Sequence, residues 1–174
     1  MKTLVLLTAL FACASAGIIK TVLDLDEVNA VSNQRLLAPV EKCEQDCLTP
    51  AEVQFYSGNR PCRESPCEIY TGEKINMIVN FTAPNYLENL EPKLDMHISI
   101  LSFPVDIGEP NACHQITNTM CPLVKDEPVS YKPEFYLPSL IPDKTVASLQ
   151  LSLLDKDTNK SVFCFSIDVQ LLSN

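Results

Sequence analysis

The chain has 174 residues, with 13 Lys and Arg against 22 Asp and Glu, a formal net charge of −9 at neutral pH. This acidic balance excludes nucleic acid as an expected partner, because phosphate binding needs clustered Lys and Arg. The chain also has only four glycines and two histidines, so it lacks a glycine-rich phosphate loop and has few groups for acid–base chemistry. We expect no enzymatic activity, no cofactor and no metal.

The first 16 residues have the organisation of a secretory signal peptide. Lys2 supplies a positive charge, residues 4–12 are apolar apart from Thr8, and Ala14-Ser15-Ala16 fits the small-residue rule for cleavage. The apolar run is too short to span a bilayer. We therefore expect residues 1–16 to be removed and the product to be secreted, outside the cell or in the lumen of endosomes or lysosomes.

Residues 17–42 form a second distinct stretch. They contain no cysteine and no strand-like run, and the segment from Val22 to Val28 has the spacing of a short amphipathic helix. We interpret residues 17–42 as a leader extension or propeptide, and residues 43–174 as one domain.

Seven cysteines remain after removal of the signal peptide, and in an oxidising compartment they predict a disulfide framework. They are Cys43, Cys47, Cys62, Cys67, Cys113, Cys121 and Cys164. Because seven is odd, at least one stays unpaired, is capped by a small thiol or bonds to another chain. The spacing of the first four also suits two zinc-ligand pairs, but the secretory route and the remote histidines favour disulfides.

Beyond residue 43 the chain shows the period-2 alternation of strands that have one buried and one solvated face. The clearest runs are residues 75–81, 94–100, 149–153 and 163–171, with shorter ones near 53–56 and 129–135. About seven antiparallel strands separated by turns predict an all-β, immunoglobulin-like sandwich. Periodicity alone does not distinguish a filled core from a cavity between the sheets.

Two sequons, Asn80-Phe81-Thr82 and Asn159-Lys160-Ser161, are expected to carry N-linked sugar. Asn80 falls on the outward face of its strand, and Asn159 lies in a polar turn between the last two strands.

A resemblance to a known family rests on six cysteines and their flanks. The relevant stretches are Cys47, Pro61 to Cys67, Glu109 to Cys113, Cys121-Pro-Leu-Val-Lys125 and Asn159 to Cys164. Over about residues 44–172 the chain resembles the Niemann-Pick type C2 family, within the ML (lipid-recognition) domains, and it is similar to mite group 2 allergens. The resemblance implies the pairs Cys47–Cys164, Cys62–Cys67 and Cys113–Cys121, which leaves Cys43 over. A register in which Cys43 meets Cys164 stays open.

The resemblance also implies a pocket, because members of this family hold a lipid between two splayed sheets. The implied lining residues are Phe81, Met96, Ile98, Ile100, Leu149, Leu151, Phe163 and Phe165. Its mouth would include Val105, Leu137 and Ile141, within the segments 103–110 and 137–142. Two of these are aliphatic where relatives carry aromatic groups, which leaves the preferred lipid open.

The expected function is that of a secreted, monomeric carrier that binds a sterol or another apolar lipid and transfers it. Transient contact with a membrane or a membrane lipid-transfer partner is expected, because transfer needs a mouth that meets one. Two alternatives stay open: an extracellular module that recognises a microbial lipid, fatty acid or hydrophobic signal in immunity or chemosensing, and a structural sandwich with a filled core.

Overall fold

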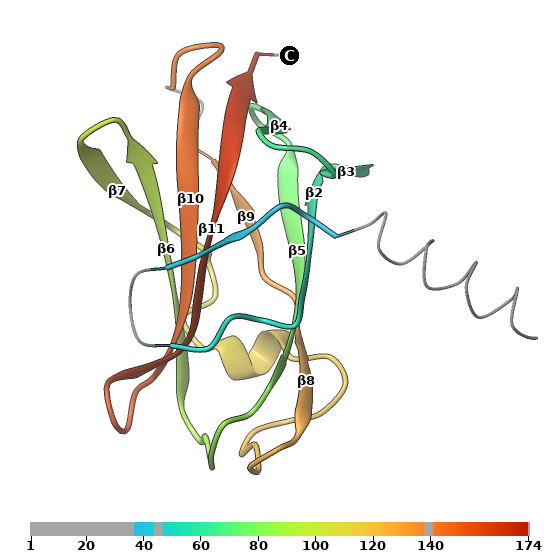
Figure 1. Ribbon diagram of the computed structural model, residues 1–174, viewed down its shortest axis with the longest axis vertical. Helices are drawn as coiled ribbons and strands as arrows, with labels where there is room; N and C mark the ends of the chain where they lie inside the picture. Colours follow the sequence, from blue (N-terminus) through green and yellow to red (C-terminus); the bar gives the residue numbers. More distant parts are fainter. Residues whose placement is uncertain (1–36, 44–46, 138–140, 174) are drawn as a thin grey trace, which may run out of the picture. The chain divides into compact units, whose positions relative to one another are not determined.

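The computed structural model of the protein describes residues 37–43, 47–137 and 141–173, and these residues form two β-sheets packed face to face (Figure 1). The signal peptide and most of the expected leader lie outside the described residues. The one helix of the described chain is the short 3-10 turn η1 (Ala112–Gln115). Within the described ranges, no helix is long and apolar enough to cross a membrane.

The first sheet contains the two longest strands at its centre. Its order is β1 (Glu41–Lys42), β11 (Lys160–Leu172), β10 (Val146–Asp155), β6 (Leu90–Ile98) and β7 (Leu101–Val105), with β4 (Cys67–Tyr70) beside β11. All pairs are antiparallel except β4 with β11, which is parallel. β7 is therefore an edge strand that is held only by β6 and the turn between them.

The second sheet is centred on β5. Its order is β3 (Arg60–Pro61), β2 (Glu52–Ser57), β5 (Lys74–Thr82) and β8 (Pro128–Tyr131), and β9 (Glu134–Tyr136) also pairs with β5. The expected run 129–135 is thus two strands. Pro133 lies between them, where it cannot donate a ladder hydrogen bond, although its carbonyl accepts one from the Met77 amide.

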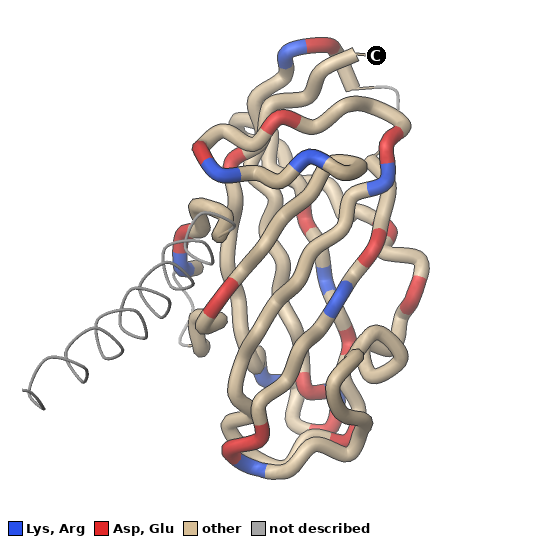
Figure 2. The backbone as a smooth tube through the Cα atoms, turned by 90° about the vertical axis from the view of Figure 1, so that its right-hand side faces the viewer, with Lys and Arg blue, Asp and Glu red and all other residues tan. Residues whose placement is uncertain are grey.

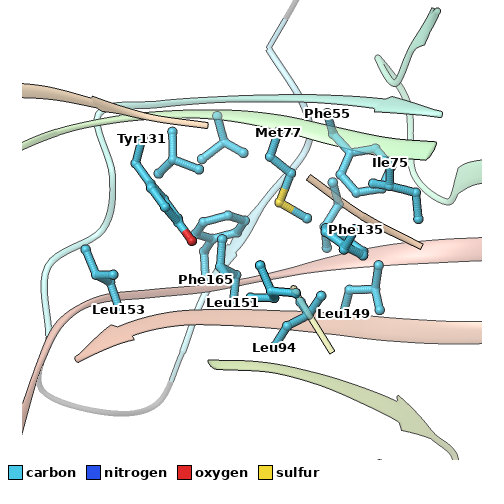
Figure 3. Close-up of a cluster of buried hydrophobic side chains, with 14 of the residues drawn as sticks. Phe55, Ile75, Met77, Leu94, Tyr131, Phe135, Leu149, Leu151, Leu153 and Phe165 are labelled. Carbon is cyan, nitrogen blue, oxygen red and sulfur yellow. The ribbon is translucent and has the colours of Figure 1, made fainter. Parts of the chain in front are cut away.

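The predicted alternation is confirmed in the core. On β5, Ile75, Met77, Val79 and Phe81 are buried, while the residues between them are partly exposed. On β11 the same pattern holds from Phe165 to Leu171, so apolar side chains of both sheets meet in one cluster (Figure 3). Burial of these side chains stabilises the sandwich by roughly 25 cal/mol for each Å² of apolar surface removed from water.

Three disulfides close the described structure, and one differs from the implied set. Cys62–Cys67 and Cys113–Cys121 pair as the resemblance implies, but Cys164 is bonded to Cys43, and Cys47 is the free thiol. The pair Cys47–Cys164 that the resemblance implies is therefore wrong, and Cys43 takes the place of Cys47. The physical reason is that β1 places Lys42 opposite Phe165, so the next residue, Cys43, reaches Cys164 on the outer face of β11.

The segment just before Cys43 belongs to the sandwich. Ala38 is buried, and its amide donates to the carbonyl of Val53 on β2, while β1 pairs with β11. Residues 37–42, assigned to a leader extension on sequence grounds, therefore form part of the folded domain. No cysteine or alternating run marks them, because they join the sheets through backbone hydrogen bonds.

Candidate functional site

Most residues expected to line a pocket lie together between the sheets. Phe81, from the second sheet, packs its ring against Phe163 with a centroid distance of 5.1 Å, and Phe163 stacks on Phe165 at 6.1 Å. Leu149, Leu151 and Met96 are buried beside them. Six of the eight implied lining residues thus share one packed apolar core.

The β6–β7 hairpin differs from the expectation at its tip. The strand expected over 94–100 ends at Ile98, Ser99 has a positive φ of 56°, and the chain turns back into β7. Ile100 is 94% exposed at this turn instead of lining a pocket. Ile98, just before the turn, is partly buried against the core. Alternation predicts the face of a residue only while the strand continues, and here the strand reverses.

The inward face of β7 is only partly covered. In the antiparallel register, β7 residues stand opposite inward-facing β6 residues, namely Val105 with Leu94, Phe103 with Met96 and Leu101 with Ile98. Val105 is buried, whereas Phe103 and Leu101 are exposed. In Figure 1 the hairpin stands at the edge of the first sheet. We call Ile98, Leu101 and Phe103 the open face; it continues the apolar core out to the surface.

The three expected mouth residues are all at least partly covered, and Val105 lies on the same strand as the open face. Val105 and Leu137 are buried, and Ile141 is partly buried and packs against the core. Val105 also lines a groove of about 510 Å³ that runs between β6 and residues 104–110. The segment from residue 103 to 105 is strand and not loop, so the mouth is framed by an edge strand.

The loop after β7 is held by a carboxylate. Glu109 accepts a hydrogen bond from the backbone amide of Asn111 at 2.9 Å and lies 3.2 Å from the imidazole of His114. These two contacts, in that order, hold the pKa of Glu109 below its ordinary value. Cys113, the residue before His114, is bonded to Cys121, so its sulfur is not a free thiol beside that imidazole.

Within the described part of the chain, residues 96–105 of the β6–β7 hairpin contain no Lys or Arg. On the side of the molecule that Figure 2 faces, Lys and Arg occur among Asp and Glu along the backbone. The zinc interpretation of the first four mature cysteines also fails, because Cys43, Cys62 and Cys67 are in disulfides.

Two features of the site were not found by sequence reasoning. Leu101 was not singled out, because it lies beyond the strand expected over 94–100. Tyr131 is fully buried between the sheets and its hydroxyl has no hydrogen-bond partner among the described residues. A tyrosine at an inward strand position gives no sequence signal about whether its hydroxyl finds a partner.

The fold and this site define a class: a disulfide-stapled β-sandwich whose apolar interior reaches the surface along one edge hairpin. The sequence profile of the ML domain family matches residues 38–171. The chain belongs to this family of lipid-binding proteins, which confirms the resemblance seen in the sequence.

A solved structure shares the architecture. A Niemann-Pick type C2 protein from the Japanese carpenter ant is 19% identical and superposes with a TM-score of 0.64, over 76% of this chain and 98% of that one. Chicken MD-1, solved in complex with lipid IVa, is 18% identical over 76% of this chain and 97% of that one, with a TM-score of 0.41.

Proposed function

We propose that this protein is a secreted, non-enzymatic carrier that holds a sterol or a similar apolar lipid between its two sheets. It acts outside the cell or in the lumen of endosomes or lysosomes, where disulfides persist. The observation that carries the proposal is the continuity of the open face with the core: inward positions of the β6–β7 pair pass from buried Leu94 and Met96 to exposed Leu101.

The energetics favour such a carrier. Exposure of an apolar lipid to water costs about 25 cal/mol of free energy for each Å² of exposed apolar surface. Side chains of the sandwich core offer an apolar surface without a charged group, so binding there removes this cost and requires no covalent chemistry. The lipid enters by separating the sheets along the edge strand β7, which pairs with β6 alone.

Transfer proceeds through contact of the open face with a membrane or with a membrane lipid-transfer partner. The exposed Ile100 at the hairpin turn leads this contact, and the half-buried Ile98 connects it to the interior. Exposed apolar groups grouped at one edge are typical of surfaces that meet another apolar surface.

Native mass spectrometry of the protein purified from a secreting cell culture tests the proposal. We expect an added mass that matches one sterol or another apolar lipid per monomer. A second measurement uses donor vesicles that contain a fluorescent sterol and acceptor vesicles that do not. It follows the transfer of the sterol between them after this protein is added. An anionic glycolipid as the only bound species would favour the recognition module, and no binding across sterols, fatty acids and phospholipids would favour a filled-core sandwich.

A further inference from the structure

Tyr131 is a buried tyrosine whose hydroxyl is unsatisfied. Three polar side-chain atoms are buried without a hydrogen-bond partner among the described residues: His97 Nε2, Gln115 Oε1 and the Tyr131 hydroxyl. Only Tyr131 belongs to a side chain that is buried completely. Buried tyrosines ordinarily bring their hydroxyl to a partner, so a completely buried hydroxyl without one calls for an explanation.

The hydroxyl faces the space between the sheets. Figure 3 shows it pointing from β8 toward the ring of Phe165 on the opposite sheet, with Leu153 on the same side of the view. These neighbours are apolar and provide no acceptor. The hydroxyl thus faces apolar side chains of the opposite sheet.

Its depth follows from the strand register. Tyr131 pairs with Val79 on β5, whereas Phe135 pairs with Ile75 on the same strand. Ile75 lies four residues from Val79, toward the end of the sandwich that carries the open face. At about 3.3 Å for each strand residue, Tyr131 lies roughly 13 Å further in than Phe135. On the other sheet, Leu149 pairs with Met96, beside Phe103 of the open face, while Leu153 is four residues deeper. A molecule that enters at the open face therefore reaches Tyr131 with its leading end.

We infer that the Tyr131 hydroxyl recognises an oxygen atom at the leading end of the bound lipid. This rests on the proposed function and adds the orientation and chemistry of the ligand: an apolar lipid that carries a hydroxyl or carboxyl group and enters with that group first. The phenol donates one hydrogen bond to the lipid oxygen and has lone pairs to accept one from a lipid hydroxyl.

The protonation state suits this role. Burial, and secondarily the negative charge of Glu109, raise the pKa of Tyr131 well above its ordinary value. The hydroxyl thus stays protonated and remains a donor at every physiological pH. A site that carries one hydrogen-bonding group discriminates against an analogue that lacks the matching oxygen, since the buried group is then left unpaired.

The test compares two lipid pairs that differ by an oxygen group at one end: cholesterol against 5-cholestene, and palmitic acid against hexadecane. Binding of each is measured by native mass spectrometry and by competition with a fluorescent sterol. We expect the unmodified protein to prefer the oxygen-bearing member of at least one pair by about tenfold, which corresponds to about 1.4 kcal/mol. Tyr131→Phe should lose this preference while binding the deoxygenated member unchanged.

Tyr136→Phe is the matched control, because Tyr136 is an exposed tyrosine on β9 and its change should leave the preference intact. Lipid-free Tyr131→Phe should unfold at the same temperature as the unmodified protein or higher, since its hydroxyl makes no bond within the described protein. A lower unfolding temperature, or a preference retained in Tyr131→Phe, would overturn the inference. Equal binding of both members of each pair would overturn it while leaving the carrier function standing, and no binding of any of the four lipids would overturn both.

Discussion

Met96 and Phe103 stand directly opposite each other in the antiparallel pair of β6 and β7, yet Met96 is 3% exposed and Phe103 is 43% exposed. Both side chains belong to the same face of the first sheet, because directly opposed residues share a face. The difference arises because β6 has a hydrogen-bonded strand on each side, β10 and β7, whereas β7 is an edge strand. The inward-facing side chains of β7 therefore extend beyond the part of the core that the second sheet covers. The pair marks the line at which the interior becomes surface.

The open face can be tested by adding a charge at its centre. Leu101→Asp should slow sterol transfer between vesicles by at least about tenfold, because withdrawing a leucine from an apolar contact costs about 1.5 kcal/mol or more. The unfolding temperature should change little, since Leu101 is 56% exposed. Val124→Asp is the control, because Val124 is 58% exposed and lies in the loop before β8. Equal slowing by both variants would show that the hairpin has no special part in transfer.

The disulfide register predicts unequal roles for two neighbouring cysteines. Cys47→Ser should leave stability nearly unchanged, whereas Cys43→Ser combined with Cys47→Ser should lower the free energy of unfolding by about 4 kcal/mol. The reason is that the Cys43–Cys164 bond closes a loop with a sequence separation of 121, which restricts the unfolded chain.

Urea unfolding without reductant measures both variants, and peptide mapping of the alkylated native protein should recover Cys47 as the modified thiol. The double variant is needed because Leu48 lies against β11, its carbonyl accepting from the Cys164 amide at 3.2 Å. Cys47 thus stays near Cys164 and could replace Cys43 in the single variant. Recovery of alkylated Cys43 with Cys47 bonded would contradict the register.

The hydrogen bonds of the Glu127 carboxylate predict a pH-dependent contribution to the free energy of unfolding. Its carboxylate accepts hydrogen bonds from the Thr119 hydroxyl and from the Val124 amide at 2.9 Å, and these bonds lower its pKa below the ordinary 4.5. A lowered folded-state pKa means that the stabilisation is fully present above about pH 4.5 and is lost as the pH falls through the folded value.

Glu127→Gln should therefore be less stable than the unmodified protein at pH 7 and at pH 5, and the difference should shrink as the pH falls further below 4.5. Thermal unfolding across pH 7 to 3 measures this. Glu88→Gln is the control, because Glu88 is exposed and its carboxylate accepts no hydrogen bond from the described residues. A difference that stays constant down to pH 3 would rule out the carboxylate as its source.

The two sequons predict different sugar occupancy. Asn159 is exposed at the β10–β11 turn, whereas Asn80 is partly buried in the middle of the second sheet and donates to Glu52 at 3.1 Å. We expect Asn159 to be modified more completely than Asn80. Intact mass before and after enzymatic removal of N-linked sugar, in Asn159→Gln and Asn80→Gln, measures the occupancy of each site. Heavier modification at Asn80 would show that strand position does not limit access.

Sequence alternation predicted the buried faces of β5, β10 and β11 correctly, because side-chain direction in a strand has a period of two and apolar residues occupy the face that is shielded from water. It failed at Ile100, where the chain turns, and over residues 129–135, where Pro133 interrupts the ladder. Local pattern carries no information on where a strand ends if apolar residues continue through the turn, as Ile98, Ile100 and Leu101 do.

The sequence by itself determined the family, the all-β class and the sides on which most core residues lie, since these depend on cysteine flanks and on local periodicity. Only the tertiary structure decided that Cys43 and not Cys47 meets Cys164, that residues 37–42 join the sheets, and that Leu101 is exposed while the Tyr131 hydroxyl is enclosed without a partner. Each of these depends on contacts between segments far apart in the chain, and a local pattern does not encode which segments meet.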